Sequence, residues 1–227
     1  MKKATCNLTR CFLCTHCTTD WKELIAIKKT SLHFKRGEAL FAEGEPVKGL
    51  YFIYSGAVKV HKHWTAEKEL IVRFMKTGDI VGHRGWGSGD HYPVSATALE
   101  DTVACFIPGA FLQSTLQAEH GFALQLLQFY AAELNKGELR MRNLALMEVK
   151  GRIADALLEL NAVYGVNKAG YNAVTVTRQD IAAYAGTTYE TVFKFMRTLI
   201  ADKIISVKGK SIRILQLKKL QAFKNSP

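Results

Sequence analysis

The sequence lacks the features that would indicate a membrane protein, a secreted protein or an enzyme. No stretch approaches the roughly 20 apolar residues that a membrane-spanning helix needs. The polar N-terminus from Met1 to Cys6 lacks the apolar core of a signal peptide, so we expect a cytoplasmic protein. There is no nucleophile–base pair, no paired carboxylates beside a glycine-rich site and no phosphate-binding loop, and we therefore expect no enzymatic activity.

Acidic residues are too few to balance the basic ones. The 227 residues include 20 Asp and Glu against 31 Lys and Arg, which gives a formal net charge of +11. This excess favours a polyanionic partner, because neutralising phosphates releases their counterions. Nucleic acid is the first candidate and a membrane surface the second. The length predicts two compact domains.

Cysteine is rare outside the N-terminus. The sequence has five cysteines, of which four are crowded at Cys6, Cys11, Cys14 and Cys17, while Cys105 stands alone. In a reducing cytosol such crowding indicates metal or redox chemistry rather than disulfides.

Short alternating apolar runs separated by turns predict an antiparallel β-barrel or roll between Ser31 and Ile107. Only Ser55-Gly56 separates the run 50–54 from the run 57–60, which predicts a tight hairpin there. Further turns are expected at the glycines of three polar segments, which are Gly37, Gly44 and Gly78.

After Pro108 the pattern becomes helical. Apolar residues alternate at spacings of four and three, as in the seam of a coiled coil. The seam consists of Ala123, Leu127, Tyr130, Leu134, Gly137, Met141 and Leu144. Two copies of this helix could pair along the seam in a homodimer, or the same face could pack on the chain's own barrel. Gly137 weakens the seam, because glycine costs about 1 kcal/mol of helix propensity.

A second amphipathic helix is expected before the C-terminal region. One face of it carries Val149, Ile153, Leu157 and Leu160, and it ends near Gly165. Residues 174–177, Val-Thr-Val-Thr, have the composition of a strand.

Two further helices are marked by caps. Thr177 with Asp180 three residues later predicts a short helix that stops at Gly186. Thr187 with Glu190 predicts a full capping box and a longer helix. Two capped helices joined by a tight glycine turn form a helix-turn-helix.

The second helix of this motif has one side suited to the major groove of DNA. Its buried side is expected to carry Val192, Met196 and Leu199. A glutamate can accept from cytosine, a lysine or arginine can donate to guanine, and an aromatic edge can meet a thymine methyl. The residues of the exposed side that offer these groups are Tyr189, Glu190, Phe193, Lys194 and Arg197. The alternative is that Glu190 and Lys194 form an ordinary i,i+4 ion pair on a solvated face.

Two strand-like segments around Lys208-Gly209-Lys210 predict a wing whose basic tip contacts phosphate. We therefore predict binding of double-stranded DNA. In addition to the helix face and the two wing lysines, the predicted contacts are Arg178, Thr187 and Thr188.

In their order and spacing these segments resemble the Crp/Fnr family over nearly the whole chain, and its FNR branch more closely than its cyclic-AMP receptor branch. The segments are RGEALFAEG at 36–44, GDIVG at 78–82, GSGDHYP at 87–93, ALE at 98–100, ETV at 190–192 and VKGK at 207–210. The resemblance implies a homodimer on a roughly palindromic DNA site, and contact with RNA polymerase if the protein is an activator.

The resemblance also implies an α+β fold. It consists of a cysteine-rich segment at 1–20, an antiparallel β-roll like the cyclic-nucleotide-binding jelly roll at 21–115, a dimerisation helix at 116–147 and a winged helix-turn-helix at 148–227.

Two departures from the family bear on specificity. The family reads bases with Glu-x-x-Ser-Arg or Glu-x-x-Gly-Arg, whereas this chain has Glu190, Phe193 and Lys194. A lysine lacks the planar fork that arginine offers to guanine, so we expect a different half-site. In the cyclic-AMP receptors a glutamate holds the ribose and an arginine the phosphate, at positions that His83 and Tyr92 occupy here. Binding of cyclic AMP is therefore disfavoured.

FNR-type sensors hold a [4Fe-4S] cluster with N-terminal cysteines and one distant cysteine shortly before Ile-Pro. Cys105 resembles the distant ligand, and Cys11, Cys14 and Cys17 are the expected N-terminal ligands, with Cys6 as the alternative. The array differs from that of FNR in its final gap. A closed zinc site of the four clustered thiols, or free thiols that respond directly to oxidation, remain alternatives. The histidines in or near turns of the roll receive no metal role; they are His61, His63, His83 and His91.

The predicted mechanism is a redox or oxygen sensor in which the cysteine centre biases the long helix and thereby the separation of the two recognition helices. The competing prediction is a small-molecule sensor whose ligand binds in the roll between Gly78 and Val94 while the cysteines are structural.

Overall fold

A computed structural model describes residues 11–65, 68–87 and 89–224. The described chain forms two compact units. One contains the described residues up to Lys62 together with Met75–Lys136, and the other contains His63–Phe74 and the residues from Gly137 onward. Strands β4 (Ala57–Thr65) and β5 (Lys68–Lys76) and helix α4 (His120–Leu146) run continuously through this division.

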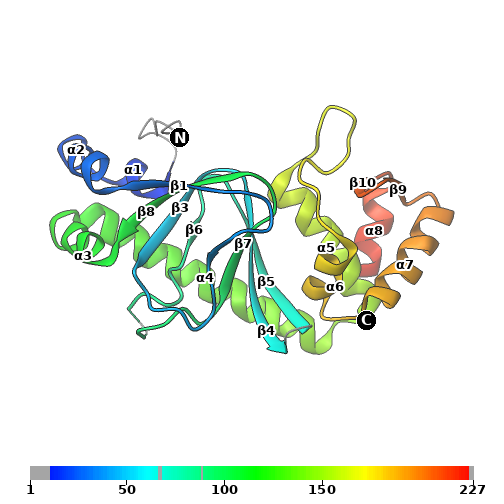
Figure 1. The fold of residues 1–227 in the computed structure, drawn as a ribbon. Coiled ribbons are helices and arrows are strands. Elements are labelled where there is room, and N and C mark those ends of the chain that lie inside the picture. Colours follow the sequence, from blue (N-terminus) through cyan, green and yellow to red (C-terminus); the bar gives the residue numbers. More distant parts are fainter. Residues whose placement is uncertain (1–10, 66–67, 88, 225–227) are drawn as a thin grey trace. The chain divides into compact units, whose positions relative to one another are not determined.

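The chain forms an antiparallel roll of two four-stranded sheets, whose strands belong to the first unit except for the end of β4 and most of β5 (Figure 1). One sheet has the order β1-β8-β3-β6 and the other the order β2-β7-β4-β5. The remaining strands are β1 (Thr30–Phe34), β2 (Ala39–Phe41), β3 (Gly49–Ser55), β6 (Ile80–Val81), β7 (Ser95–Ala98) and β8 (Thr102–Pro108). Leu50, Phe52, Ile80 and Ile107 are fully buried where the sheet β1-β8-β3-β6 packs against the helices. The predicted roll is confirmed.

The predicted hairpin at Ser55-Gly56 is wrong. Strands β3 and β4 lie in different sheets, so at Gly56 the chain crosses from one sheet to the other. Gly56 has a φ of 104°, and a Cβ there would lie 2.4 Å from Thr102 Oγ1 and 2.8 Å from Thr102 Cα. Only glycine fits this crossing. The turns expected at Gly37, Gly44 and Gly78 are present, each with a positive φ.

Two short helices precede the roll and two follow it. They are α1 (Phe12–His16), α2 (Thr19–Lys28), α3 (Gly109–Ala118) and α4. Helix α4 buries Phe122 and Leu126 in the same apolar cluster as Leu50 and Phe52 of the roll. None of the helices within 11–65, 68–87 and 89–224 combines the length and the apolar composition of a membrane-spanning segment.

The second unit contains a winged helix-turn-helix. Its elements are α5 (Val149–Tyr164), α6 (Arg178–Ala185), α7 (Tyr189–Ala201), β9 (Ile205–Lys208), β10 (Ser211–Ile214) and α8 (Leu217–Lys224). Helix α5 ends at Gly165 as expected and buries Ile153, Leu157 and Leu160. The α+β arrangement of roll, long helix and winged helix-turn-helix is the one that the sequence predicts.

Two local predictions in this unit need correction. Residues 174–177 form no strand, because Val174 and Val176 are buried without a strand partner and Thr177 already caps α6. The second capping box is also absent. Helix α7 starts one residue later than predicted, so Thr188 is its N-cap and accepts from the amide of Thr191, and Glu190 is not at the position that closes a box.

Candidate nucleic-acid interface and cysteine site

Helix α7 has one buried and one exposed face, as its sequence predicts. Val192, Met196 and Leu199 are at most 2 % exposed and fix the helix to the core of the motif. Tyr189, Glu190, Phe193, Lys194 and Arg197 are exposed together on the other face. Glu190 and Lys194 form no ion pair with each other in the part of the chain that the structure describes. The alternative interpretation of this face as an i,i+4 ion pair is therefore not supported.

Helix α6 adds an arginine to this face. The Arg178 guanidinium lies 5.7 Å from the centre of the Phe193 ring. The Phe193 ring in turn stacks on Tyr189, with 6.2 Å between centroids and 15° between planes. The three side chains form an exposed cation–aromatic ladder across the start of both helices.

The wing lies beside this ladder. Strands β9 and β10 pair Lys208 with Ser211, and the tip contains Gly209, with a φ of 61°, and the exposed Lys210. A cavity of about 240 Å³ lies between the start of α6 and the wing, and its lining includes Arg178, Tyr189 and Lys210. A wider groove of about 750 Å³ follows the exposed face of α7 and includes Glu190, Phe193 and Lys194.

The caps hold these helix starts in place. Thr177 and Asp180 form a complete capping box on α6, and Gly186 ends α6 in the left-handed conformation with a φ of 60°. Thr187 donates its amide to the carbonyl of Ala182 in the turn, and Thr188 caps α7. The pKa of Glu190 is lowered, chiefly by its own backbone amide and then by Thr188, which keeps its carboxylate ionised and able only to accept.

Two arginines outside the motif bind its turn. Arg152 Nε donates to the carbonyl of Ala185 at 2.8 Å and Arg152 Nη1 to that of Met147 at 2.8 Å. Arg140 donates to the carbonyl of Tyr184, and its guanidinium lies 3.8 Å from the centre of the Tyr184 ring. The bonds to Tyr184 and Ala185 occupy carbonyls at the C-terminal end of α6 that the helix itself leaves unsatisfied.

Some residues of the predicted seam of α4 are exposed to solvent, and others are half-buried. Leu127, Leu134 and Met141, each seven residues apart, are 66–67 % exposed. Tyr130 donates its hydroxyl to the carbonyl of His83 at 2.9 Å, and Ala123 and Leu144 are half-buried. Phe122 and Leu126 of α4 are buried in the cluster beside the roll, and Tyr130 of the seam packs against the same cluster. Packing on the chain's own roll therefore leaves Leu127, Leu134 and Met141 uncovered.

The four described cysteines are buried in one apolar cluster. Cys11, Cys14, Cys17 and Cys105 are 1–7 % exposed, and none forms a disulfide. They share this cluster with Phe122 and Leu126 of α4. Cys105 reaches it from strand β8, and the other three from α1 and its two ends. Cys6 lies outside the described residues.

The thiols differ in their readiness to ionise. Hydrogen bonding by the Cys14 side chain lowers the pKa of Cys11 to about 7, helped by backbone amides at the start of α1. The Cys14 amide donates to Cys11 Sγ at 3.4 Å. Burial raises the pKa of Cys17 to about 12, and the charge of Glu119 adds to this effect. A bound metal would offset the cost of a buried thiolate at Cys17.

The spacing of the thiols bears on which group they could hold. A closed zinc site keeps its sulfurs about 4 Å apart, since each Zn–S bond is about 2.3 Å. Among the described residues, no three thiols form a group close enough to hold one metal ion. An iron–sulfur cluster is a larger body whose thiolates bind different iron atoms. Buried thiols that share a cluster without single-ion spacing fit the larger group better.

The cysteine segment is tied to the helices that follow the roll. Phe12, between Cys11 and Leu13, has its ring 6.0 Å from that of Phe122 and 5.7 Å from that of Phe129 on α4. Thr18 donates its amide and its hydroxyl to the Glu119 carboxylate at 2.8 and 2.7 Å. A conformational change in the cysteine segment would therefore alter its contacts with α4.

The positions at which the cyclic-AMP receptors hold their ligand are occupied by internal contacts. Tyr92 is 2 % exposed and donates its hydroxyl to the carbonyl of Gly49 at 2.8 Å. The buried His83 ring meets Phe129 edge-on at 4.9 Å. Arg84, the neighbouring cation, pairs with Glu133 of α4 at 3.5 Å.

Sequence reasoning missed residues that act through tertiary contacts. Lys150 and Thr198 line the groove of α7, and Gln179 lines the cavity at the wing, but no motif marks them. Arg140, Arg152 and Phe12 likewise gain their roles from partners distant in the sequence. An arginine within a helix or a phenylalanine between cysteines carries no signal of such a partner.

Comparison with known proteins agrees with this architecture. Residues 31–119 match the cyclic nucleotide-binding domain family, and residues 151–223 match the Crp-like helix-turn-helix domain family. Transcriptional activator protein anr of Pseudomonas aeruginosa is 30% identical over 200 residues, which are 86% of this chain and 81% of that protein. The CRP-like cAMP-activated global transcriptional regulator of Mycobacterium tuberculosis is also 30% identical, over 189 residues, 82% of this chain and 84% of the relative.

A solved structure extends the comparison to the fold. FixK2 from Bradyrhizobium japonicum superposes with a TM-score of 0.77 at 26% identity, covering 88% of this chain and 98% of that structure. The Mycobacterium tuberculosis relative is named as cAMP-activated and the Pseudomonas aeruginosa relative is not, yet both are 30% identical to this chain. Together the two domain matches and the relatives show that this chain belongs to the Crp/Fnr family of transcription regulators, which are not enzymes.

Proposed function

We propose that this regulator binds DNA sequence-specifically as a homodimer, and that a cysteine-bound iron–sulfur centre controls its affinity. The observation that carries the proposal is the single buried cluster shared by Cys11, Cys14, Cys17, Cys105 and the start of α4. It joins the candidate sensor to the helix that precedes the DNA-reading domain.

DNA contact is assigned to the exposed face of α7 and to the wing. Glu190 and Lys194 offer an acceptor and a donor to base edges. Arg178, Lys208 and Lys210 offer positive charge to the backbone phosphates on either side. The grooves beside α7 and the wing supply surface for this contact.

Dimer formation is assigned to the exposed stripe of α4. Leu127, Leu134 and Met141 repeat every seven residues, which is the period of a left-handed coiled coil. Pairing two stripes would bury apolar surface that the monomer leaves in water. A two-fold axis along α4 would present two α7 helices to two half-sites, and an activator of this kind would in addition contact RNA polymerase.

The sensing role is assigned to the thiols. Cys11, Cys14, Cys17 and Cys105 would hold the cluster, with Cys6 as the alternative N-terminal ligand. A [4Fe-4S] cluster supplies a redox-active group that responds to oxygen. The protein's own part is to bury the thiolates, to exclude water and to connect the segment to α4 through Phe12. Cyclic AMP is not the proposed signal. Tyr92 and His83 occupy the positions compared with the ligand-binding residues of the cyclic-AMP receptors, and here both side chains contact other residues of the chain.

The proposal is tested by purifying the protein without oxygen and measuring its visible absorption, iron and acid-labile sulfide. We expect a broad visible band that bleaches in air, with iron and sulfide in equal amounts. The matched variant Cys105→Ser should lose the band, because only the cluster requires this distant thiol. A colourless protein with stoichiometric zinc would refute the cluster and favour a structural zinc site.

A further inference from the structure

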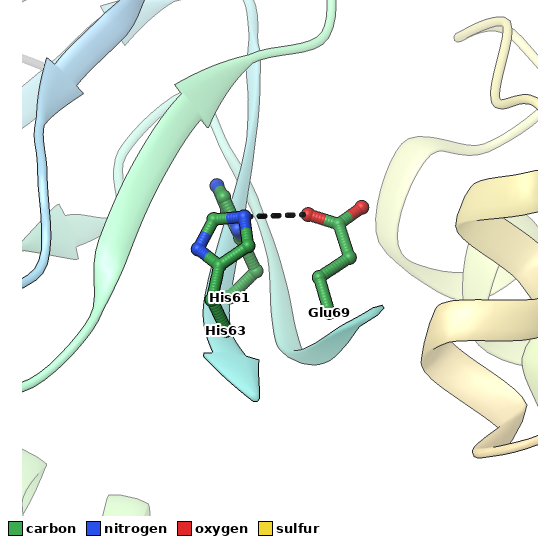
Figure 2. A group of neighbouring side chains, drawn as sticks. All are labelled: His61, His63 and Glu69. Atoms are coloured by element: carbon green, nitrogen blue, oxygen red, sulfur yellow. Dashed lines mark ion pairs between the residues drawn. The ribbon is translucent and has the colours of Figure 1, made fainter. Parts of the chain in front are cut away.

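Two histidines and one glutamate meet on the β4–β5 hairpin, away from the cysteines. His61 and His63 are two residues apart on β4, so that their side chains leave the strand on the same face. Glu69 lies on the neighbouring strand β5 (Figure 2). One ligand atom from each of the three residues lies within 4.8 Å of those of the other two.

We propose that His61, His63 and Glu69 form a binding site for a divalent transition-metal ion. Two imidazole nitrogens and one carboxylate oxygen are the ligand set of open zinc sites and of non-haem iron sites. Imidazole ligands favour zinc, nickel, cobalt, copper or ferrous iron over the oxygen-seeking calcium and magnesium. Three protein ligands leave a coordination position for water, so the ion would be exchangeable.

The separations are close to those that an ion needs. Ligand atoms bonded to one ion at about 2.1 Å lie roughly 3 to 4 Å apart. His63 Nε2 and Glu69 Oε2 are 3.9 Å apart, and their side chains are 44 % and 18 % exposed. The exposed His63 can therefore close the remaining distance by side-chain rotation. At 3.9 Å the contact between the two groups is long, and a contact of this kind contributes little to stability.

The buried member of the set is already oriented. His61 is 5 % exposed, and its Nε2 lies 2.9 Å from Thr97 Oγ1 on strand β7. When this nitrogen donates its hydrogen to Thr97, Nδ1 carries the lone pair that a metal requires. An outer hydrogen bond of this kind on the second ring nitrogen is typical of histidines that ligate metals.

This assignment revises the sequence-based interpretation, which gave these histidines no metal role. The pattern His-x-His is visible in the sequence, but the third ligand comes from the next strand and depends on the register of the hairpin. The site is independent of the cysteine cluster, because it uses nitrogen and oxygen ligands on a different part of the roll. A metal ion bound at this site would be a second signal to which the regulator responds.

Cobalt(II) distinguishes the two sites by its absorption. With nitrogen and oxygen ligands it gives weak visible bands, whereas thiolate ligands add an intense near-ultraviolet charge-transfer band. The exposed Trp64, next to His63, provides a second signal, because a bound paramagnetic ion quenches its fluorescence. We would titrate the full-length protein with cobalt(II), following both signals, and repeat the titration with Trp64→Phe.

The matched variants are His63→Ala, Glu69→Gln and the control His33→Ala, which removes an exposed histidine from strand β1. We expect the unaltered protein and the control to bind one ion with weak visible bands and quenched Trp64 fluorescence. The two site variants should bind it about tenfold more weakly or worse. Equal cobalt affinity in His63→Ala and the unaltered protein, or only the intense thiolate band, would overturn the proposal. Because Cys105→Ser leaves these ligands intact, failure of the cluster and failure of this site are distinguishable.

Discussion

Arg152 and Ala185 are 33 residues apart, yet Arg152 Nε donates to the Ala185 carbonyl at 2.8 Å. The same guanidinium binds the carbonyl of Met147, which follows helix α4, at 2.8 Å and that of Leu144, in the last turn of α4, at 3.4 Å. One side chain thus holds both the end of α4 and the end of α6. This contact links the orientation of α4 to the turn that precedes α7.

Replacing Arg152 should therefore affect stability and DNA binding together. Arg152→Ala leaves carbonyls without their donor and should lower the free energy of unfolding by about 2 kcal/mol. Arg152→Lys should recover only part of this, because lysine lacks the planar fork that reaches several carbonyls. Denaturant unfolding and DNA titration measure the two effects. Arg142→Ala is the control, since within the described residues Arg142 bonds only the side chain of its neighbour Asn143; an equal loss in the control would contradict the assignment.

The wing and the recognition helix should make different contributions to DNA binding. Lys210→Ala removes a phosphate contact and should weaken binding to all sequences alike, lowering the slope of log affinity against log salt by about 1. Glu190→Ala should instead relax the preference at one base pair by about 1 to 3 kcal/mol with little change in that slope. Titrations of specific and scrambled DNA at several salt concentrations separate the two. If Lys210→Ala altered base preference, the wing would not be a phosphate contact.

The stripe on α4 predicts the oligomeric state. Leu134→Glu places a charge at the centre of the proposed seam and should convert the dimer to a monomer that binds DNA at least tenfold more weakly. Ala132→Glu is the matched control, because Ala132 is exposed on the side of α4 away from the stripe. Sedimentation or light scattering gives the mass. A Leu134→Glu protein that remained dimeric would place the interface elsewhere.

The crossing at Gly56 predicts a large loss of stability. Gly56→Ala should cost about 3 kcal/mol or more, since a side chain there is strained by its φ of 104° and meets Thr102 at 2.4 and 2.8 Å. Gly44→Ala carries a similar φ of 84° but meets nothing within 4 Å, so it isolates the cost of backbone strain. Thermal and denaturant unfolding of both variants provides the comparison. Equal losses would show that the close approach to Thr102 is unimportant.

Features that depend on neighbouring residues could be predicted from the sequence. The caps at Thr177 and Gly186 and the apolar face of α7 are local, because a cap needs only the next three residues and a helical face repeats every 3.6. The wing could be predicted because two short strand-like segments lie on either side of a glycine. The predicted exposed face of α7 is therefore the one that the structure shows.

Features that depend on pairing could not be predicted. The run before Ser55 and the run after Gly56 are strands as expected, but their partners come from distant parts of the chain, so that the link between them crosses sheets. Residues 174–177 have strand composition but no partner strand. Glu69 could not be matched to His61 and His63 without the hairpin register, and Phe12 could not be matched to Phe122 without the fold.

The central claim is that the cysteine centre controls DNA affinity through α4. The most direct test is to measure the affinity of anaerobically purified protein for its DNA site before and after exposure to air, alongside Cys105→Ser and Phe12→Ala. The account predicts that air weakens binding by the unaltered protein about tenfold or more, within the usual range of coupling energies. Cys105→Ser should show no response to air, and Phe12→Ala should keep the visible band while its response diminishes. Equal affinity of the unaltered protein before and after air, with the band bleached, would contradict the account.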